Sequence, residues 1–109
     1  MKNPNIELYL QDMRDAIDNI FSKVDGLTFL QFKRDDTLQL AIERLFEILG
    51  EAANRIDPDF RSLNAIIDWK RIRGFRNRIV HDYFGIDYEI VWTIIENDLD
   101  NLIELEKTL

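Results

Sequence analysis

Four residues near position 80 could together act on a phosphate ester. Arg76 and Asn77 are followed closely by His81 and Tyr83. Histidine side chains titrate near neutrality, so such a ring can take a proton from a ribose 2′-hydroxyl or give one to a leaving 5′-oxygen. The fork of an arginine can hold a phosphate and stabilise negative charge developing on it. These residue types predict RNA cleavage that needs no metal ion.

The spacing of these residues limits how a single helix could present them. On an ideal helix, Asn77 and His81 share nearly the same face, and so do Arg76 and Tyr83. Arg76 and His81, however, diverge by roughly 140°. The length of the arginine, an irregularity in the helix, or a symmetric dimer could bring them to one cleft. We favour the dimer, because one chain has a single histidine for both proton-transfer roles.

Helical spacing of apolar residues predicts the first two main helices. The first is expected from about Asn5 to Asp25, followed by a short helical or turn-like bridge at residues 28–32. The second is expected to begin after Asp36 as its N-cap, with Gln39 as the partner in a capping box. The pair Asp57-Pro58 is expected to end that helix and to open a short turn.

Two further helices are expected in the second half of the chain. One is capped by Asp68 and runs from about Trp69 to Phe84, with Gly85 as its stop signal. The last begins after Asp87 and extends over residues 88–109. Four main helices with one or two short helical turns predict an all-α, up-and-down bundle forming a single domain over residues 1–109.

Composition excludes several classes of protein. With 46% hydrophobic and 32% charged residues, the chain is typical of a globular protein, and no apolar run could cross a membrane. It has no cysteine and one histidine, so we expect neither a metal site nor a cofactor. No export signal is evident, which favours the cytoplasm.

Charge is distributed unevenly along the chain. The net charge is −7, which argues against a protein that coats DNA or RNA by bulk electrostatics. One stretch, residues 70–78, is nevertheless basic and contains no acid; its cations are Lys70, Arg71, Arg73, Arg76 and Arg78. Apart from Arg76, these are expected to contact at most an RNA backbone. The acidic pair Asp98 and Asp100 is expected on an exposed helix face.

The stretch around His81 resembles the HEPN superfamily, and specifically its HepT-like toxins. That family's pattern is an arginine, a polar residue, three further positions and then His-x-Tyr, which Arg76, Asn77, His81 and Tyr83 match without departure. Residues 48–53 and 82–85 also look like the family, and the resemblance extends over essentially the whole chain.

The resemblance implies a homodimeric toxin of a type II-like or type VII toxin-antitoxin system that cleaves tRNA or mRNA without metal. Arg76 and His81 would be catalytic, and Asn77 would orient the phosphate or the ring. The implied partner is a minimal nucleotidyltransferase antitoxin, which can transfer AMP to Tyr83. Glu51 is a candidate anchor for one of the arginines.

Other interpretations of the same residues stay open. A lone helical histidine is more often structural than catalytic, and an interfacial tyrosine such as Tyr83 often packs with its hydroxyl at the surface. The main alternative function is a non-catalytic HEPN module that dimerises and binds a nucleotidyltransferase or a nucleotide. Cleavage requires a proton-transferring ring, whereas such a module requires mainly an apolar interface.

Overall fold

The computed structural model describes residues 5–81 and 85–98, and helices form most of this part of the chain. The predicted all-α class is confirmed. The helices are α1 (Ile6–Val24), α2 (Phe29–Lys33), α3 (Asp36–Arg55), α4 (Pro58–Leu63), α5 (Trp69–Arg73), α6 (Phe75–Ile79) and α7 (Tyr88–Asn97). Two strands of two residues each, β1 (Val80–His81) and β2 (Gly85–Ile86), lie between α6 and α7.

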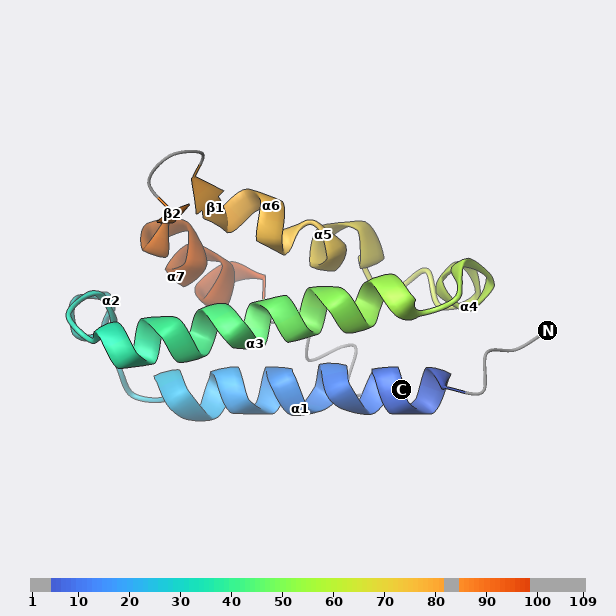
Figure 1. Ribbon diagram of the computed structural model, residues 1–109, viewed down its shortest axis with the longest axis horizontal. Helices are drawn as coiled ribbons and strands as arrows, with labels where there is room; N and C mark the ends of the chain where they lie inside the picture. Colours follow the sequence, from blue (N-terminus) through green and yellow to red (C-terminus); the bar gives the residue numbers. More distant parts are fainter. Residues whose placement is uncertain (1–4, 82–84, 99–109) are drawn as a thin grey trace.

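The two long helices form an antiparallel pair. Helix α1 packs along the length of α3 (Figure 1). Its apolar residues recur at spacings of three and four, and Met13, Ile17 and Ile20 are completely buried. From α3, Ile42, Phe46 and Leu49 complete this part of the core, each with no exposed surface. The first predicted helix is therefore confirmed to within one residue at each end.

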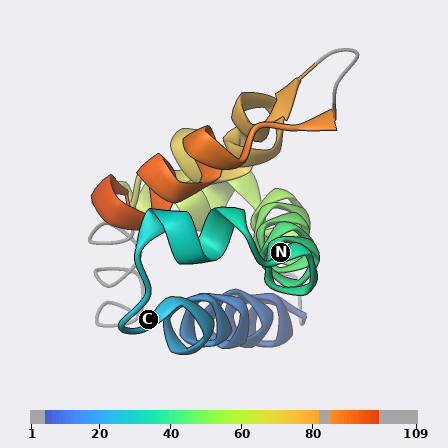
Figure 2. The ribbon, with the colours of Figure 1, turned by 90° about the vertical axis from the view of Figure 1, so that its left-hand side faces the viewer.

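The second half of the chain covers the face of α3 that points away from α1. Figures 1 and 2 show α5, α6 and α7 on that side, with α2 lying between α7 and α1 at one end. Phe75 of α6 meets Phe46 of α3 edge to face, with 5.6 Å between the ring centroids. Helix α3 is thus the central element of three helical layers, as its broad apolar face requires.

Most helix starts follow the predicted capping residues. The side chains of Asp68 and Asp87 accept backbone hydrogen bonds at the starts of α5 and α7, and Pro58 is the first residue of α4. The cap of α3 is Asp35 rather than the predicted Asp36; its carboxylate accepts from the Leu38 amide at 2.9 Å.

The capping box expected at α3 is absent from that helix and present in α2. Gln39 turns back to donate to the carbonyls of Phe32 and Lys33 instead of capping α3. In α2, Thr28 and Gln31 form the reciprocal pair of hydrogen bonds. The short element predicted over residues 28–32 is therefore a capped helical turn.

The predicted helix from Trp69 to Phe84 is wrong in its second half. Gly74 separates α5 from α6, and α6 ends at Ile79. The chain then becomes extended, and β1 pairs antiparallel with β2 in the register Val80↔Ile86 and His81↔Gly85. Gly85 has φ +81°, a left-handed conformation that favours glycine, so it permits the ladder rather than stopping a helix.

The last predicted helix is confirmed where the structure describes it, over Tyr88–Asn97. Val91, Ile94 and Ile95 face the core, and Trp92 packs against Phe32 with ring centroids 5.2 Å apart. Positions 99–109 lie outside the described residues. Among the helices of the described part, none is long and apolar enough to cross a membrane.

Tyr88 links α7 to α3 and gives the fold a dependence on alkaline pH. Its hydroxyl donates to Glu43 at 3.4 Å, and burial, followed by the charge of Glu43, raises the pKa of Tyr88 above its ordinary value of 10.0. The unfolded chain therefore loses this proton at lower pH than the folded chain. The stabilising contribution is complete below about pH 10 and is lost as pH rises through the folded pKa.

We therefore expect the phenol absorbance of the folded protein to show a high-pH step that disappears in Tyr88→Phe. The same variant should lose part of the fall in thermal stability above about pH 10. An identical titration for both proteins would contradict the assignment to Tyr88.

Candidate active site in the cleft between α3 and α6

A cleft of about 220 Å³ lies where α5 and α6 cross α3. It contains two of the four residues predicted to act on phosphate, Arg76 and Asn77 of α6. Helix α3 supplies the opposite wall because Glu47, Glu51 and Asn54 recur there at helical spacing. The full lining is Glu47, Gly50, Glu51, Asn54, Arg73, Arg76 and Asn77.

Arg73 is a cleft residue whose role sequence reasoning underestimated. Its Nε donates to Oδ1 of Asn54 at 2.6 Å, so α3 fixes the direction of this guanidinium. The nearby Arg61 donates to the carbonyl of Ala53 at 3.4 Å. Burial and then the charge of Arg73 lower the pKa of Arg61 from its ordinary value. Arg61 and Arg73 therefore lie close enough to repel each other at the α4 end of the cleft.

Arg76 differs from the other arginines around the cleft. It is exposed, and among the described residues no carboxylate lies within 4.0 Å of its guanidinium. Asn77 is also exposed and, within the same part of the chain, makes no side-chain hydrogen bond. Both side chains are therefore available to a bound anion.

His81 lies two residues beyond the end of α6, in β1. Its backbone is extended and pairs with Gly85, so the helical-face comparison between Arg76 and His81 does not apply. The helix ends between the two residues, at Ile79, so it does not continue with the regular spacing that would make them diverge. Tyr83 lies outside the described residues.

The basic stretch of residues 70–78 does not form one continuous surface. Arg71 and Arg78 turn to Asp98 at the end of α7, with distances of 3.2 Å and 2.9 Å. The Asp98 side chain is only 7% exposed, so the prediction of an exposed acid at this position is wrong. Asp98 instead ties α5 and α6 to α7; Asp100 lies outside the described residues.

We expect Asp98→Ala to lower the free energy of unfolding by about 2 kcal/mol, the magnitude of hydrogen bonds to a charged group. The double variant Arg71→Ala/Arg78→Ala should cost about 3 kcal/mol, because it leaves a buried carboxylate without either cation. Urea denaturation of the three proteins measures both effects. If all three proteins had the same free energy of unfolding, the ion pairs of Asp98 would contribute nothing measurable, because solvent screens them.

Glu51 shares the cleft with Arg73 and Arg76, as a role in anchoring an arginine requires. It is exposed, however, and forms no ion pair within 4.0 Å with an arginine of the described residues. The observed hydrogen-bond partner of Arg73 is instead the neutral Asn54, one turn further along α3. The anchoring prediction for Glu51 is therefore not supported by a direct contact.

Comparison with known proteins identifies the family of the chain. The chain matches the family described as HepT-like, "Ribonuclease HepT-like", over residues 13–109. A protein named "Putative RNase" from Caldanaerobacter subterraneus subsp. tengcongensis is 36% identical over 107 residues, covering 98% of this chain and 91% of the relative. A "Probable ribonuclease HepT" from Thermococcus cleftensis is 34% identical, covering 86% of each chain.

A further relative named "Putative RNase", from Methanocaldococcus jannaschii, is 32% identical and covers 100% of this chain and 91% of its own length. No solved structure gives a significant match. The family match includes α3, α5, α6 and α7, the elements that build the cleft, and continues through His81 and Tyr83. The chain belongs to the HepT-like family of the HEPN superfamily.

Proposed function

We propose that this protein is a ribonuclease in which Arg76 binds the scissile phosphate and His81 transfers protons. The observation that carries the proposal is the state of Arg76. It stands in the cleft beside Asn77 with no carboxylate partner among the described residues, while Arg71 and Arg78 are held by Asp98. A guanidinium left available in this way suits a phosphate ligand.

The proposed reaction is transesterification within the RNA. The ribose 2′-oxygen attacks the adjacent phosphorus, and the bond from phosphorus to the 5′-oxygen breaks, leaving a 2′,3′-cyclic phosphate. A neutral imidazole accepts the 2′-hydroxyl proton, and an imidazolium gives a proton to the departing 5′-oxygen. Arg76 stabilises charge developing on the phosphate oxygens. No step in this scheme requires a metal ion.

Two neighbouring side chains would assist Arg76. Asn77 can donate its amide protons to a phosphate oxygen or orient the imidazole. Arg73, whose direction is set by Asn54, can hold the adjoining phosphate of the same strand. Glu47 and Glu51 on the opposite wall limit how deeply an anion enters, because carboxylates repel it.

We further propose that the active form is a homodimer. One chain supplies one histidine, whereas the reaction uses a base and an acid in the same turnover. A two-fold axis beside the cleft would place a second His81 across from the first. The substrate of such an enzyme would be tRNA or mRNA, whose single-stranded loops can enter a cleft of this kind.

The proposed partner is a minimal nucleotidyltransferase antitoxin acting on Tyr83. This part of the proposal rests on the match to the His-x-Tyr pattern, since Tyr83 follows His81 by two residues. Transfer of AMP to the Tyr83 hydroxyl would add bulk and a negative charge. Tyr83 is close in the chain to Arg76 and His81, the residues proposed to bind and cleave at the phosphate. RNA would then be excluded by steric hindrance and repulsion.

Induced expression in a host that lacks the partner tests the ribonuclease assignment. We expect growth arrest and fragmentation of total RNA with the wild-type chain, and neither effect with His81→Ala. The fragments should carry 2′,3′-cyclic phosphate ends, which distinguishes this chemistry from metal-dependent hydrolysis.

Equal growth and intact RNA for both proteins, at matched soluble levels, would favour the non-catalytic binding module instead. Fragmentation to the same extent by both proteins would show that host nucleases cause the signal. Coexpression with the nucleotidyltransferase should restore growth through Tyr83, and a Tyr83→Phe variant should escape modification by AMP.

A further inference from the structure

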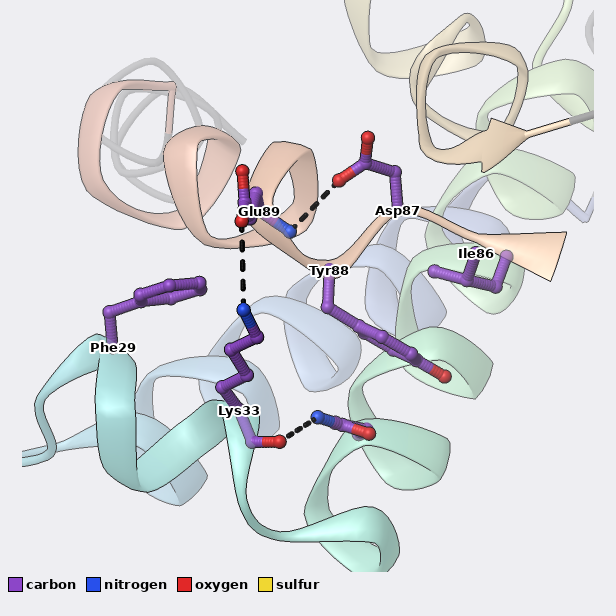
Figure 3. Close-up of a pocket in the computed structure, with 7 residues that line it drawn as sticks. Phe29, Lys33, Ile86, Asp87, Tyr88 and Glu89 are labelled. Carbon is purple, nitrogen blue, oxygen red and sulfur yellow. Dashed lines mark hydrogen bonds and ion pairs between the residues drawn. The ribbon is translucent and has the colours of Figure 1, made fainter. Parts of the chain in front are cut away.

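A second and larger hollow, of about 520 Å³, opens at the other end of α3 (Figure 3). Its volume lies within the range of small-molecule sites. It is formed where α2 and the start of α3 approach β2 and the start of α7. The lining residues are Phe29, Lys33, Gln39, Ile86, Asp87, Tyr88 and Glu89.

Gln39 gives this hollow a buried acceptor without a donor. The residue is only 8% exposed, and its amide nitrogen donates to the carbonyls of Phe32 and Lys33 at 3.2 Å and 2.8 Å. Because both partners are acceptors, the nitrogen must be the atom that faces them, which fixes the orientation of the amide. The Oε1 atom receives no hydrogen bond from the described residues, although buried acceptors normally have a partner.

Two aromatic rings form opposing walls of the same hollow. Figure 3 shows Phe29 on one side and Tyr88 on the other, with the side chain of Lys33 between them. The Lys33 ammonium lies 5.8 Å from the centre of the Phe29 ring and 3.7 Å from Glu89. Both charged side chains are more than half exposed, so their contact is weak and a ligand can displace it.

We propose that this hollow binds a nucleobase that carries an exocyclic amino group. A flat ring would stack against Phe29 or Tyr88, and its amino group would donate to Oε1 of Gln39. Adenine, cytosine and guanine each carry such a donor, whereas uracil has no exocyclic amino group and presents a carbonyl oxygen where cytosine has its amino group. The assignment of this base to an RNA substrate rests on the proposed ribonuclease function.

The position of the hollow connects it to the proposed active site. Gln39 and Gly50, which lies in the cleft with Arg76, are separated by about 16 Å along α3 at the rise of an α-helix. Ile86, a lining residue, pairs across the ladder with Val80, the neighbour of His81. One RNA strand could therefore place a phosphate in the cleft and a nearby base in the hollow.

Binding of mononucleotides, followed by NMR, tests the hollow without relying on catalysis. We titrate the uniformly ¹⁵N-labelled His81→Ala protein with AMP, CMP and UMP. AMP and CMP should shift the side-chain amide signals of Gln39 and the backbone signals of Ile86 and Glu89. UMP should bind about tenfold more weakly, since the lost hydrogen bond leaves Oε1 unpaired.

Cleavage of short oligonucleotides tests whether the base comes from the RNA. Phe29→Ala removes one stacking wall and should lower kcat/KM about tenfold for substrates with adenine or cytosine near the cleaved bond. Its preference for these over uracil substrates should shrink as well. Phe60→Ala is the matched control, because Phe60 is also a partly buried aromatic but packs against Trp69, away from the hollow.

The outcomes separate this proposal from the ribonuclease proposal. Shifts at Gln39 without any His81-dependent cleavage would support a site for free nucleotides and overturn its role in RNA recognition. Cleavage by the wild type with unchanged base preference in Phe29→Ala, and no shifts at Gln39, would overturn the hollow and leave the ribonuclease intact. Thermal unfolding of both alanine variants shows whether they remain folded.

Discussion

Replacing His81 with alanine is expected to lower the rate of RNA cleavage by about 10²- to 10⁴-fold, the usual contribution of general acid-base catalysis. The loss should lie toward the upper end, because in a symmetric dimer the same substitution removes both the base and the acid. Rates measured under single-turnover conditions with a labelled oligonucleotide would report the chemical step. The wild type should show a bell-shaped dependence of rate on pH, and the variant should not.

The dimer itself should survive this substitution. Sedimentation equilibrium of the wild type and His81→Ala should give the same mass, since one polar side chain contributes little to an apolar interface. A monomeric wild type that still cleaves RNA would contradict the two-histidine scheme. An alanine variant that keeps the wild-type rate after further purification would contradict the role of His81.

Arg76→Ala is expected to lower kcat about 10²- to 10³-fold, as when one donor to a developing oxyanion is removed. Arg76→Lys should recover only part of the rate, because an ammonium is a point charge and cannot make the paired contacts of a guanidinium. Arg76 is exposed and has no partner among the described residues. Its removal should therefore change the free energy of unfolding by only about 0.5 kcal/mol.

Lys70 provides the control for charge alone. It is an exposed cation on α5 and does not line the cleft with Arg76. Lys70→Ala removes one positive charge, as Arg76→Ala does, and should leave kcat nearly unchanged. If the two variants lose activity equally, the basic stretch acts through its overall field and Arg76 has no particular role.

The helices were predictable wherever local chemistry decides the structure. Asp68 and Asp87 are short acids directly before apolar helical spacing, and Pro58 suits a first helical position, so each start could be inferred from its neighbours. At α3 two adjacent acids compete, and local chemistry does not distinguish Asp35 from Asp36. In the structure Asp35 caps the helix, and the side chain of Gln39 donates to carbonyls at the end of α2 instead of forming a capping box.

The end of α6 was not predictable from spacing. Ile72, Phe75 and Ile79 recur as in a helix, and the apolar Val80 that follows gives no sign of a break. The chain becomes extended because β2 is available to pair with β1, and because the Asp87 amide donates to the Ile79 carbonyl at 2.7 Å. These contacts depend on positions six to eight residues ahead, beyond any helical period.

The proposed site was only partly visible in the sequence. Arg76 and Asn77 were identified by residue type and do share a cleft. The contact between Arg73 and Asn54 was not predicted, because the two residues are 19 positions apart in the chain and lie on different helices. The burial of Asp98 was not predicted, because the two arginines that pair with it lie 20 and 27 positions earlier, on other helices.

The pairing of Asp98 with two arginines also determines how RNA binding responds to ionic strength. Those two cations share one carboxylate, and in the cleft Glu47 and Glu51 lie beside Arg73 and Arg76, so the net positive charge that a strand would meet is small. Few counterions would leave a bound strand, and each phosphate contact contributes a slope of only about −0.7 for single strands. Affinity should therefore fall gently as salt is added, and shape and base contacts, rather than counterion release, would select the RNA.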